Sequence, residues 1–408
     1  MKNRSFTGSA TILLLLLLPA ILFSQEPGDD RMQGYAFYYR NLPDSALFSF
    51  DRYLKVHPDD LGVLLLRGEL LFEKKEYEKA TADFLAVERK RKGMAAFWLA
   101  RTEVRLNHPL QAISHLREHL SSRYREPEKV ILLDEDMARL ENLPEWKQLW
   151  NEKEWYSQAD RDLQEAEKLI RDQDLPDALN ILVSLDRSGI RRSEVRMLKS
   201  EIYFRSGNMK AALEECEAAV KSDVRNHEAL EKRARLYLAS GKADKALEDC
   251  NKLLYLEPAA FEIYLLRAAS YEKSGLLAEA LTDYDLYLKY FPMADSVHYA
   301  RGMNLFLQKK YIGALGSLNR ALELDRWKAI YYTGRGQVYA ATGSLNFARK
   351  DFSMSLDIDP MNGDTWLEKA KTEARLGNKE EACHDYQKAL QLGKNEALNW
   401  LQSNCQKP

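Results

Sequence analysis

Few residues in this 408-residue chain are spaced as catalytic or metal-binding groups would be. His115 and His119 lie one helical turn apart with His108 nearby, a spacing that could hold a metal ion. No cysteine accompanies them, and we favour a solvated helix face over a metal site.

Three consecutive acids at 134–136 could form a carboxylate pair for acid–base chemistry. They lie just before an apolar helical run, and we interpret them as charges at a helix N-terminus. The sequence has no glycine-rich phosphate loop or nucleophile elbow. We therefore predict that the chain is not an enzyme and uses no cofactor or metal.

Basic residues recur at one position along the chain and could form a column that binds an anion or an acidic peptide. They are Arg67, Lys199, Arg233, Arg267, Arg301, Arg335 and Lys369. Six of the seven have an acidic residue sixteen positions later, so we expect ion pairs, because partly buried charges need partners. Arg301 differs, since its counterpart is Ser317. We predict that Arg301 has spare donors and contacts a ligand.

These basic residues belong to a repeating unit that is marked by ten alanines. The alanines recur every 34 residues, apart from one deletion of two residues and one gap, at Ala46, Ala80, Ala112, Ala178, Ala212, Ala246, Ala280, Ala314, Ala348 and Ala382. Each unit contains two apolar runs with a helical period, which predicts two amphipathic helices. Small residues stand twelve positions before most of the alanines, so the two helices should cross closely. Since one unit cannot bury its own apolar face, neighbouring units must stack into an all-α solenoid.

Residues 227–260 show the repeat most clearly. Its small, aromatic, glycine, alanine and proline positions match those of the tetratricopeptide-repeat family, at Ala234, Tyr237, Gly241, Ala246, Cys250, Leu253 and Pro258. The pattern returns in 261–294 and 329–362, and the chain resembles this family over nearly all of its length after residue 26. The resemblance implies a right-handed superhelix of helical hairpins that binds other proteins.

The repeat pattern divides the chain into segments. Residues 27–126 hold three units and residues 159–396 hold seven, while 127–158 form an irregular helical joint and 397–408 a capping helix and tail. In the joint, three tryptophans are either buried in a degenerate repeat or exposed as a docking epitope, and we favour burial. They are Trp146, Trp150 and Trp155.

Residues 1–24 have the layout of a secretory signal peptide, with Lys2 and Arg4 before an apolar run from Ala10 to Phe23. We expect cleavage after Ser24, because this run of 14 residues is shorter than the ~20 needed to span a bilayer. The chain is therefore predicted to be periplasmic or extracellular and to associate with a membrane only through a partner.

Four cysteines would then face an oxidising compartment. Cys216 and Cys250 occupy a position that other units fill with an aromatic residue, so we interpret them as buried core residues. Cys383 lies in the last unit and Cys405 in the capping helix, and a disulfide between them would pin the cap.

The inner face of the array is the predicted partner site. Peptide receptors of the resembled family hold a C-terminal carboxylate with Lys and Asn at set inner positions, and this sequence lacks them. We predict instead a mixed, largely apolar groove for an extended or helical protein segment. The candidate residues are Glu231, Arg235, Leu265, Ala269, Tyr299, Arg301, Met303, Phe306 and Gln337. The alternative, that half of the apolar ones pack within the array, stays open.

The formal net charge of −2 provides no basic field for a phosphate backbone, so we predict protein partners and no nucleic acid. The leading hypothesis is a scaffold or assembly factor of the cell envelope that holds one partner through the inner face of 193–362. A chaperone-like receptor for exported or unfolded clients and a non-catalytic subunit of an envelope enzyme complex are the alternatives. The partner's identity and the oligomeric state cannot be derived from the repeat.

Overall fold

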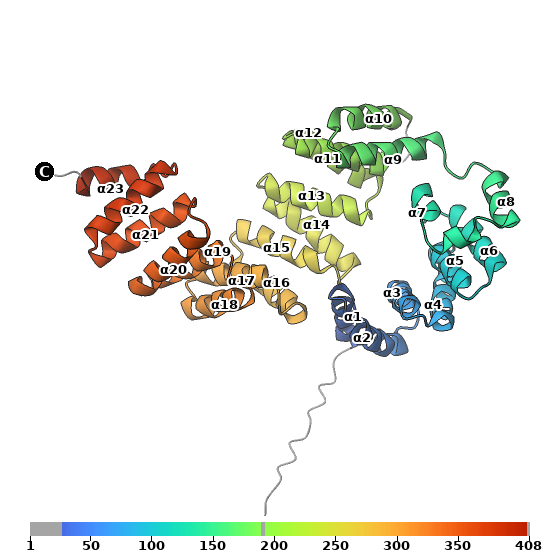
Figure 1. Ribbon diagram of the computed structural model, residues 1–408, viewed down its shortest axis with the longest axis horizontal. Coiled ribbons are helices and arrows are strands. Elements are labelled where there is room, and N and C mark those ends of the chain that lie inside the picture. Colours follow the sequence, from blue (N-terminus) through green and yellow to red (C-terminus); the bar gives the residue numbers. More distant parts are fainter. Residues whose placement is uncertain (1–26, 189–191, 406–408) are drawn as a thin grey trace, which may run out of the picture.

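The computed structural model describes residues 27–188 and 192–405, so the predicted signal peptide at 1–24 lies outside the described part of the chain. Helices and connecting turns make up all of this part, and none of its residues forms a strand. Figure 1 shows the helices following one another in pairs along a curved path, which gives an all-α repeat solenoid.

Within the described residues, ten hairpins of two packed α-helices form the array. The first helices are α1 (Pro27–Tyr39), α3 (Leu61–Glu73), α5 (Ala96–Arg105), α9 (Gln158–Arg171), α11 (Arg192–Arg205), α13 (His227–Ala239), α15 (Phe261–Lys273), α17 (Asp295–Leu307), α19 (Ala329–Ala341) and α21 (Gly363–Leu376). The second helices are α2 (Pro43–Val56), α4 (Tyr77–Lys90), α6 (Pro109–Leu120), α10 (Leu175–Ser188), α12 (Met209–Ser222), α14 (Ala243–Leu256), α16 (Leu277–Tyr290), α18 (Tyr311–Leu324), α20 (Leu345–Ile358) and α22 (Lys379–Gln391).

The two helices of a hairpin cross where the repeat places its small residues. All ten repeated alanines are fully buried. A Cβ added to Gly68 would lie 2.5 Å from Cε1 of Phe84, and one added to Gly336 would lie 2.7 Å from Cε1 of Phe352. No side chain fits at such distances in a close-packed interior, which confirms the predicted close crossing.

Most hairpins turn through one residue with a positive φ angle. Gly241 and Gly275 occupy this position with φ of 73° and 77°, as expected for a glycine that ends a helix. Lys75, Gln173 and Lys309 adopt the same left-handed backbone, with φ of 63°, 65° and 60°. A residue with a Cβ is strained in this conformation, so these three turns hold a small amount of backbone strain.

Residues 127–158 interrupt the series of hairpins with three short helices. These are α7 (Glu128–Leu132), the 3-10 helix η1 (Met137–Leu140) and α8 (Pro144–Glu152). Trp146 and Trp155 are buried, and Trp155 Nε1 donates a hydrogen bond to the carbonyl of Leu149. Their burial favours a degenerate repeat over an exposed docking epitope.

The acids at 134–136 differ from the prediction. Only Asp134 acts as a helix-capping group, by accepting hydrogen bonds from the backbone N–H groups of Asp136 and Met137. Asp136 is fully buried and forms ion pairs with Arg101 and Arg105 of α5. These carboxylates fasten the joint to the third hairpin, and a buried charge in such a network needs its partners.

The first hairpin returns to the middle of the array, a contact that the sequence analysis did not predict. The hydroxyl of Tyr290, at the end of α16, donates to Asp29 of α1 over 2.6 Å. Arg31 of α1 pairs with Glu257, just after α14, at 3.2 Å. Apolar residues of the first hairpin and of α15–α16 also share one buried cluster.

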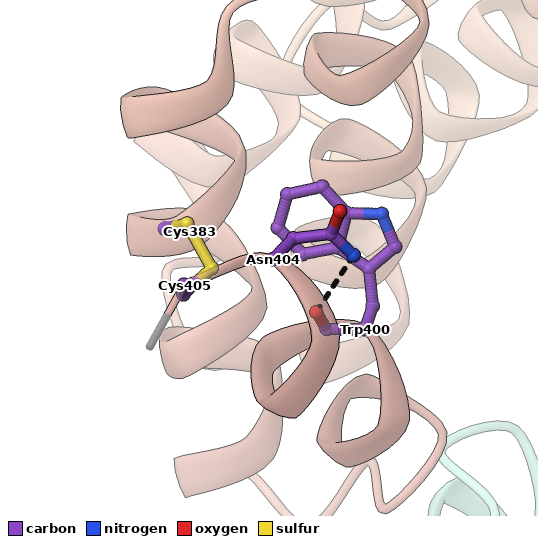
Figure 2. Close-up of a disulfide and its surroundings, with 4 residues drawn as sticks. All are labelled: Cys383, Trp400, Asn404 and Cys405. Carbon is purple, nitrogen blue, oxygen red and sulfur yellow. Dashed lines mark hydrogen bonds between the residues drawn. A yellow bond between two sulfur atoms is a disulfide. The ribbon is translucent and has the colours of Figure 1, made fainter. Parts of the chain in front are cut away.

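This contact closes the chain into a ring, from which the last hairpins extend (Figure 1). We call residues 27–188 and 192–292 the ring and residues 293–405 the arm. The arm ends in the capping helix α23 (Ala397–Asn404). Figure 2 shows a disulfide between Cys383 of α22 and Cys405, which the sequence analysis named as a candidate pair. Beside it lies Trp400, whose ring stacks on that of Tyr386 with centroids 4.4 Å apart.

Candidate partner-binding site

The predicted groove residues all lie on first helices, namely α13, α15, α17 and α19. In the part of the ring where the hairpins are seen side by side, the first helices α3, α5 and α9 lie nearer its centre than the second helices α4, α6 and α10 (Figure 1). In that part of the ring the first helices form the inner side of the array, and the groove residues lie on helices that hold the same place in their own hairpins.

Tyr299 and Met303 of α17 are only half-buried, but they also pack between hairpins. The Tyr299 ring stacks on that of Tyr331 with centroids 5.1 Å apart. A Cβ on Gly334 would lie 2.9 Å from both the Met303 Sδ and the Tyr299 Cε2, so this glycine lets α19 approach α17. Part of each side chain is therefore committed to packing, and only the remainder is available to a partner.

Leu265, Ala269, Phe306 and Gln337 are likewise half-buried, and Phe306 contacts the ring of Tyr311. These positions leave a shallow, partly apolar surface rather than a deep slot.

One side chain that the sequence analysis did not select lies next to these positions in the chain. Leu307, which follows Phe306 at the end of α17, is 59% exposed. Its apolar type was visible in the sequence, but its exposure depends on how the hairpins stack.

Glu231 and Arg235 form an ion pair along α13. The Arg235 Nε and Nη2 atoms donate to Glu231 Oε1 over 2.9 and 2.7 Å. The side chains of Glu231 and Arg235 are 40% and 54% exposed, so the pair is accessible to a partner. Such a pair can contact a charged or polar group of a partner segment.

The basic column is internally paired, which confirms the expected ion pairs. Four arginines donate two hydrogen bonds each, over 2.6–2.9 Å, to an aspartate of the same hairpin, namely Arg67 to Asp83, Arg233 to Asp249, Arg267 to Asp283 and Arg335 to Asp351. Two lysines pair in the same register, Lys199 with Glu215 at 2.5 Å and Lys369 with Asp385 at 2.6 Å. The column stabilises the hairpins and leaves little charge for an anionic ligand.

Arg301 has an acidic partner that the sequence analysis did not predict, although two bonds use only part of its five N–H donors. Its Nε donates to Asp285 Oδ1 and its Nη1 to Ser317 Oγ, each over 2.6 Å. Asp285 lies sixteen residues before Arg301, on the second helix of the preceding hairpin. Checking the position sixteen residues before Arg301, as well as the one sixteen residues after it, would have found this partner.

The same backward position supplies a second partner to other arginines of the column. These bonds join Arg67 to Asp51, Arg267 to Asn251 and Arg335 to Asn319, over 2.7–2.9 Å. Each of these arginines therefore links two successive hairpins.

His119 does not lie on a solvated face, contrary to the prediction. It is buried, its Nε2 accepts the backbone N–H of Glu126 over 2.8 Å, and its ring stacks on Phe97. Burial lowers the His119 pKa to about 4, so the imidazole is neutral at pH 7. Over 27–188 and 192–405, no group of three or more His, Cys, Asp or Glu side chains is placed to hold a metal ion.

Cys216 and Cys250 are buried and unpaired, as predicted for core residues. Burial raises their thiol pKa values to about 11 and about 12, so neither thiol is reactive at neutral pH. Among the helices that the structure describes, none has both the length and the hydropathy of a membrane span.

Comparisons with known proteins agree with this geometry. One family model described as tetratricopeptide repeat matches residues 31–96, 198–262 and 231–292, and a second one matches 363–395. The curated tetratricopeptide repeat protein 14 of Mus musculus is 36% identical over 59 residues, which are 14% of this chain and only 8% of that protein's length.

Two solved structures are similar to parts of this chain. A tetratricopeptide repeat protein from Parabacteroides merdae ATCC 43184 is 21% identical with a TM-score of 0.52, over 61% of this chain and 99% of that one. At this identity the likeness concerns the fold alone. The C-terminal part of a repeat-containing protein from Cytophaga hutchinsonii is 15% identical with a TM-score of 0.47, over 58% of this chain and 98% of that one.

Proposed function

Since the chain belongs to the tetratricopeptide-repeat family, we propose that it is a non-catalytic scaffold or assembly factor of the cell envelope. Its inner face over 193–362 holds a segment of one partner protein. Residues 1–24, whose charge and apolar pattern are typical of a signal peptide, direct export and are then removed. The disulfide between Cys383 and Cys405 supports export, because disulfides persist in oxidising compartments.

The observation that carries the proposal is the contrast between the basic column and the Glu231–Arg235 pair. The basic column is paired within and between hairpins, whereas the Glu231–Arg235 pair is exposed on a first helix. Beside it, the half-buried apolar groups of α15 and α17 offer a surface for a side chain of the partner. A charge pair next to apolar surface suits one defined sequence better than many.

A chaperone-like receptor is the second candidate, because Met303, Phe306 and Leu307 provide flexible apolar surface. Purification of the tagged chain from crosslinked envelope fractions separates the two functions. The scaffold predicts one or two stoichiometric proteins, while the chaperone predicts many substoichiometric exported proteins. Recovery in the cytoplasm with residues 1–24 still attached would contradict export.

A paired variant tests the charged contact without removing it. In Glu231→Arg with Arg235→Glu the ion pair is kept and its direction reversed, so the hairpin should lose only a few tenths of a kcal/mol. A scaffold should lose its stoichiometric partner while helical circular dichroism stays unchanged. Retained binding would place the partner elsewhere on the array.

A further inference from the structure

The turns that join successive hairpins of the arm carry large exposed apolar side chains at one repeat position. Met293, Trp327 and Met361 are 63%, 71% and 72% exposed, and Ile330, next to the Trp327 turn, is 51% exposed. We call these four residues the turn edge. The same position one unit earlier holds Ala259, which is fully buried.

In the ring, a helix already occupies this edge. α1 crosses the turn that contains Ala259, where Arg31 and Met32 border the same cavity as Pro258. The ring of Tyr39 meets that of Phe261 edge-on, with centroids 6.4 Å apart. The edge of the array therefore accepts a helix that carries methionine and aromatic side chains.

The N-terminal turn of α1 supplies the polar part of this contact. Asp29 accepts hydrogen bonds from the Lys289 ammonium group over 2.9 Å and from the Tyr290 hydroxyl over 2.6 Å. A carboxylate in the first turn of the docked helix thus meets a basic group at the end of a second helix. Such charge pairing fixes the register of a helix that is otherwise held by apolar contacts.

The turn edge continues from this interface into the arm. Arg320 of α18 reaches back to the Met293 Sδ at 3.5 Å, and Lys328 pairs with Asp295 at 2.6 Å, so successive turns touch. The guanidinium of Arg326 lies over the Trp327 ring, 5.1 Å from its centroid. Within the described residues Arg326 has no carboxylate within ion-pair distance.

We propose that the turn edge is a second docking surface, which binds an amphipathic helix of a partner protein. This helix presents large apolar side chains on one face to Met293, Trp327 and Met361, and a carboxylate to Arg326. Two features of the molecule support this occupant: α1 binds the same edge in the same chain, and Arg326 is available for a charge pair. The surface is distinct from the inner groove, because its residues lie in and beside the turns.

Peptide binding to the full chain tests the proposal. The probe is a fluorescent peptide with the sequence of residues 27–41, and a control peptide carries serine in place of Met32, Tyr35 and Tyr39. We expect saturable binding of the probe and none of the control. The double variant Trp327→Ser with Met361→Ser should weaken binding about tenfold or more, since tryptophan side chains dominate such contacts.

Ile312→Ser is the matched control variant, because Ile312 is 90% exposed on α18 but outside the turn edge. It should leave the affinity unchanged, and the melting temperature of the double variant should match that of the unmodified chain. Unchanged affinity in the double variant would overturn the proposal, because the peptide would then only be displacing α1 in the ring. Absence of binding at ~1 mM peptide would overturn it as well.

Two further readouts separate this surface from the alternatives. The double variant Glu231→Arg with Arg235→Glu should not change the affinity of the peptide. A failure of the groove proposal can therefore be distinguished from a failure of the turn-edge proposal. Sedimentation of the chain without peptide should be the same with and without the double substitution. A change from dimer to monomer would identify the turn edge as a contact between two copies and contradict a partner helix.

Discussion

The ring and the arm use the same repeat but treat the same edge in opposite ways. In the ring, α1 covers the edge, and Ala259, Phe261 and Tyr290 are buried there. In the arm, the turns expose Met293, Trp327 and Met361, which lie 34 residues apart like the repeat itself. The comparison shows that the edge is a binding surface of the array. In the ring it is covered by α1 of the same chain, and in the arm it is open.

The ring has two junctions, the joint at 127–158 and the contact of α1 with the middle of the array. Different interactions hold them together. At the joint, Arg125 pairs with Asp160 at 2.9 Å and the Tyr156 hydroxyl donates to the carbonyl of Glu126, while the buried clusters on either side stay separate. At α1, residues far apart in sequence share one buried cluster. The contact that closes the ring is therefore more apolar than the covalently continuous junction.

Removing the apolar centre of the α1 contact should have the largest effect. Phe261→Ala removes a buried ring and should cost about 3–5 kcal/mol, since it leaves a cavity between α1 and α15. Chemical denaturation measures the loss, and small-angle X-ray scattering should show a larger radius of gyration. Phe347→Ala in the arm is the control, because this exposed ring should contribute less than about 0.5 kcal/mol. Equal losses in the two variants would remove the distinction between ring and arm.

Breaking the Cys383–Cys405 disulfide should destabilise the end of the arm alone. The bridge spans 22 residues, and the loss of such a constraint on the unfolded chain is ~3 kcal/mol. Hydrogen exchange of the Cys405→Ser variant should show lost protection in α22 and α23 and unchanged protection in the ring. Lost protection that extends to α1 would mean that ring and arm unfold as one unit.

Acid should weaken the ring through His119. Its folded pKa of about 4 lies below the ordinary value of 6.5, so the neutral form stabilises the fold fully above pH 6.5. That contribution is lost as the pH falls from 6.5 toward 4 and amounts to ~3 kcal/mol.

Denaturation at pH 7 and pH 4 measures this contribution in the unmodified chain and in His119→Gln. The variant should show a smaller difference between the two pH values, since its side chain does not titrate. An identical pH dependence in both proteins would exclude His119 as the cause.

The smallest effect should come from the strained turns, where ring and arm are alike. Lys75→Gly in the ring and Lys309→Gly in the arm should each stabilise the chain by about 0.5–1 kcal/mol, since glycine adopts a positive φ without strain. Thermal denaturation measures both. A loss of stability in either variant would show that the lysine side chain contributes more than its backbone strain costs.

Much of the hairpin could be predicted from the sequence because its signals are local and repeated. The alanine series, the glycine turns and the arginine–aspartate register recur at fixed spacings, so one physical explanation served every unit. Arg301 was misjudged although its partner Asp285 stood in the same register, since only the forward spacing was considered.

The ring closure and the burial of His119 could not be predicted in this way. The contact of Asp29 with Tyr290 depends on the small rotation that each hairpin adds, summed over the whole ring, and no spacing in the sequence encodes that sum. His119 is buried because the segment after α6 folds back, so that the Glu126 N–H reaches its ring. The exposure of the groove and of the turn edge likewise depends on how the hairpins stack.

Hydroxyl-radical footprinting of the full chain tests most directly whether the edge is covered in the ring and open in the arm. The account predicts rapid oxidation of Met293, Trp327 and Met361 and slow oxidation of Phe261 and Tyr290, which lie under α1. Oxidation of Phe261 and Tyr290 as fast as that of exposed aromatic residues would contradict it, because the ring would then be open in solution.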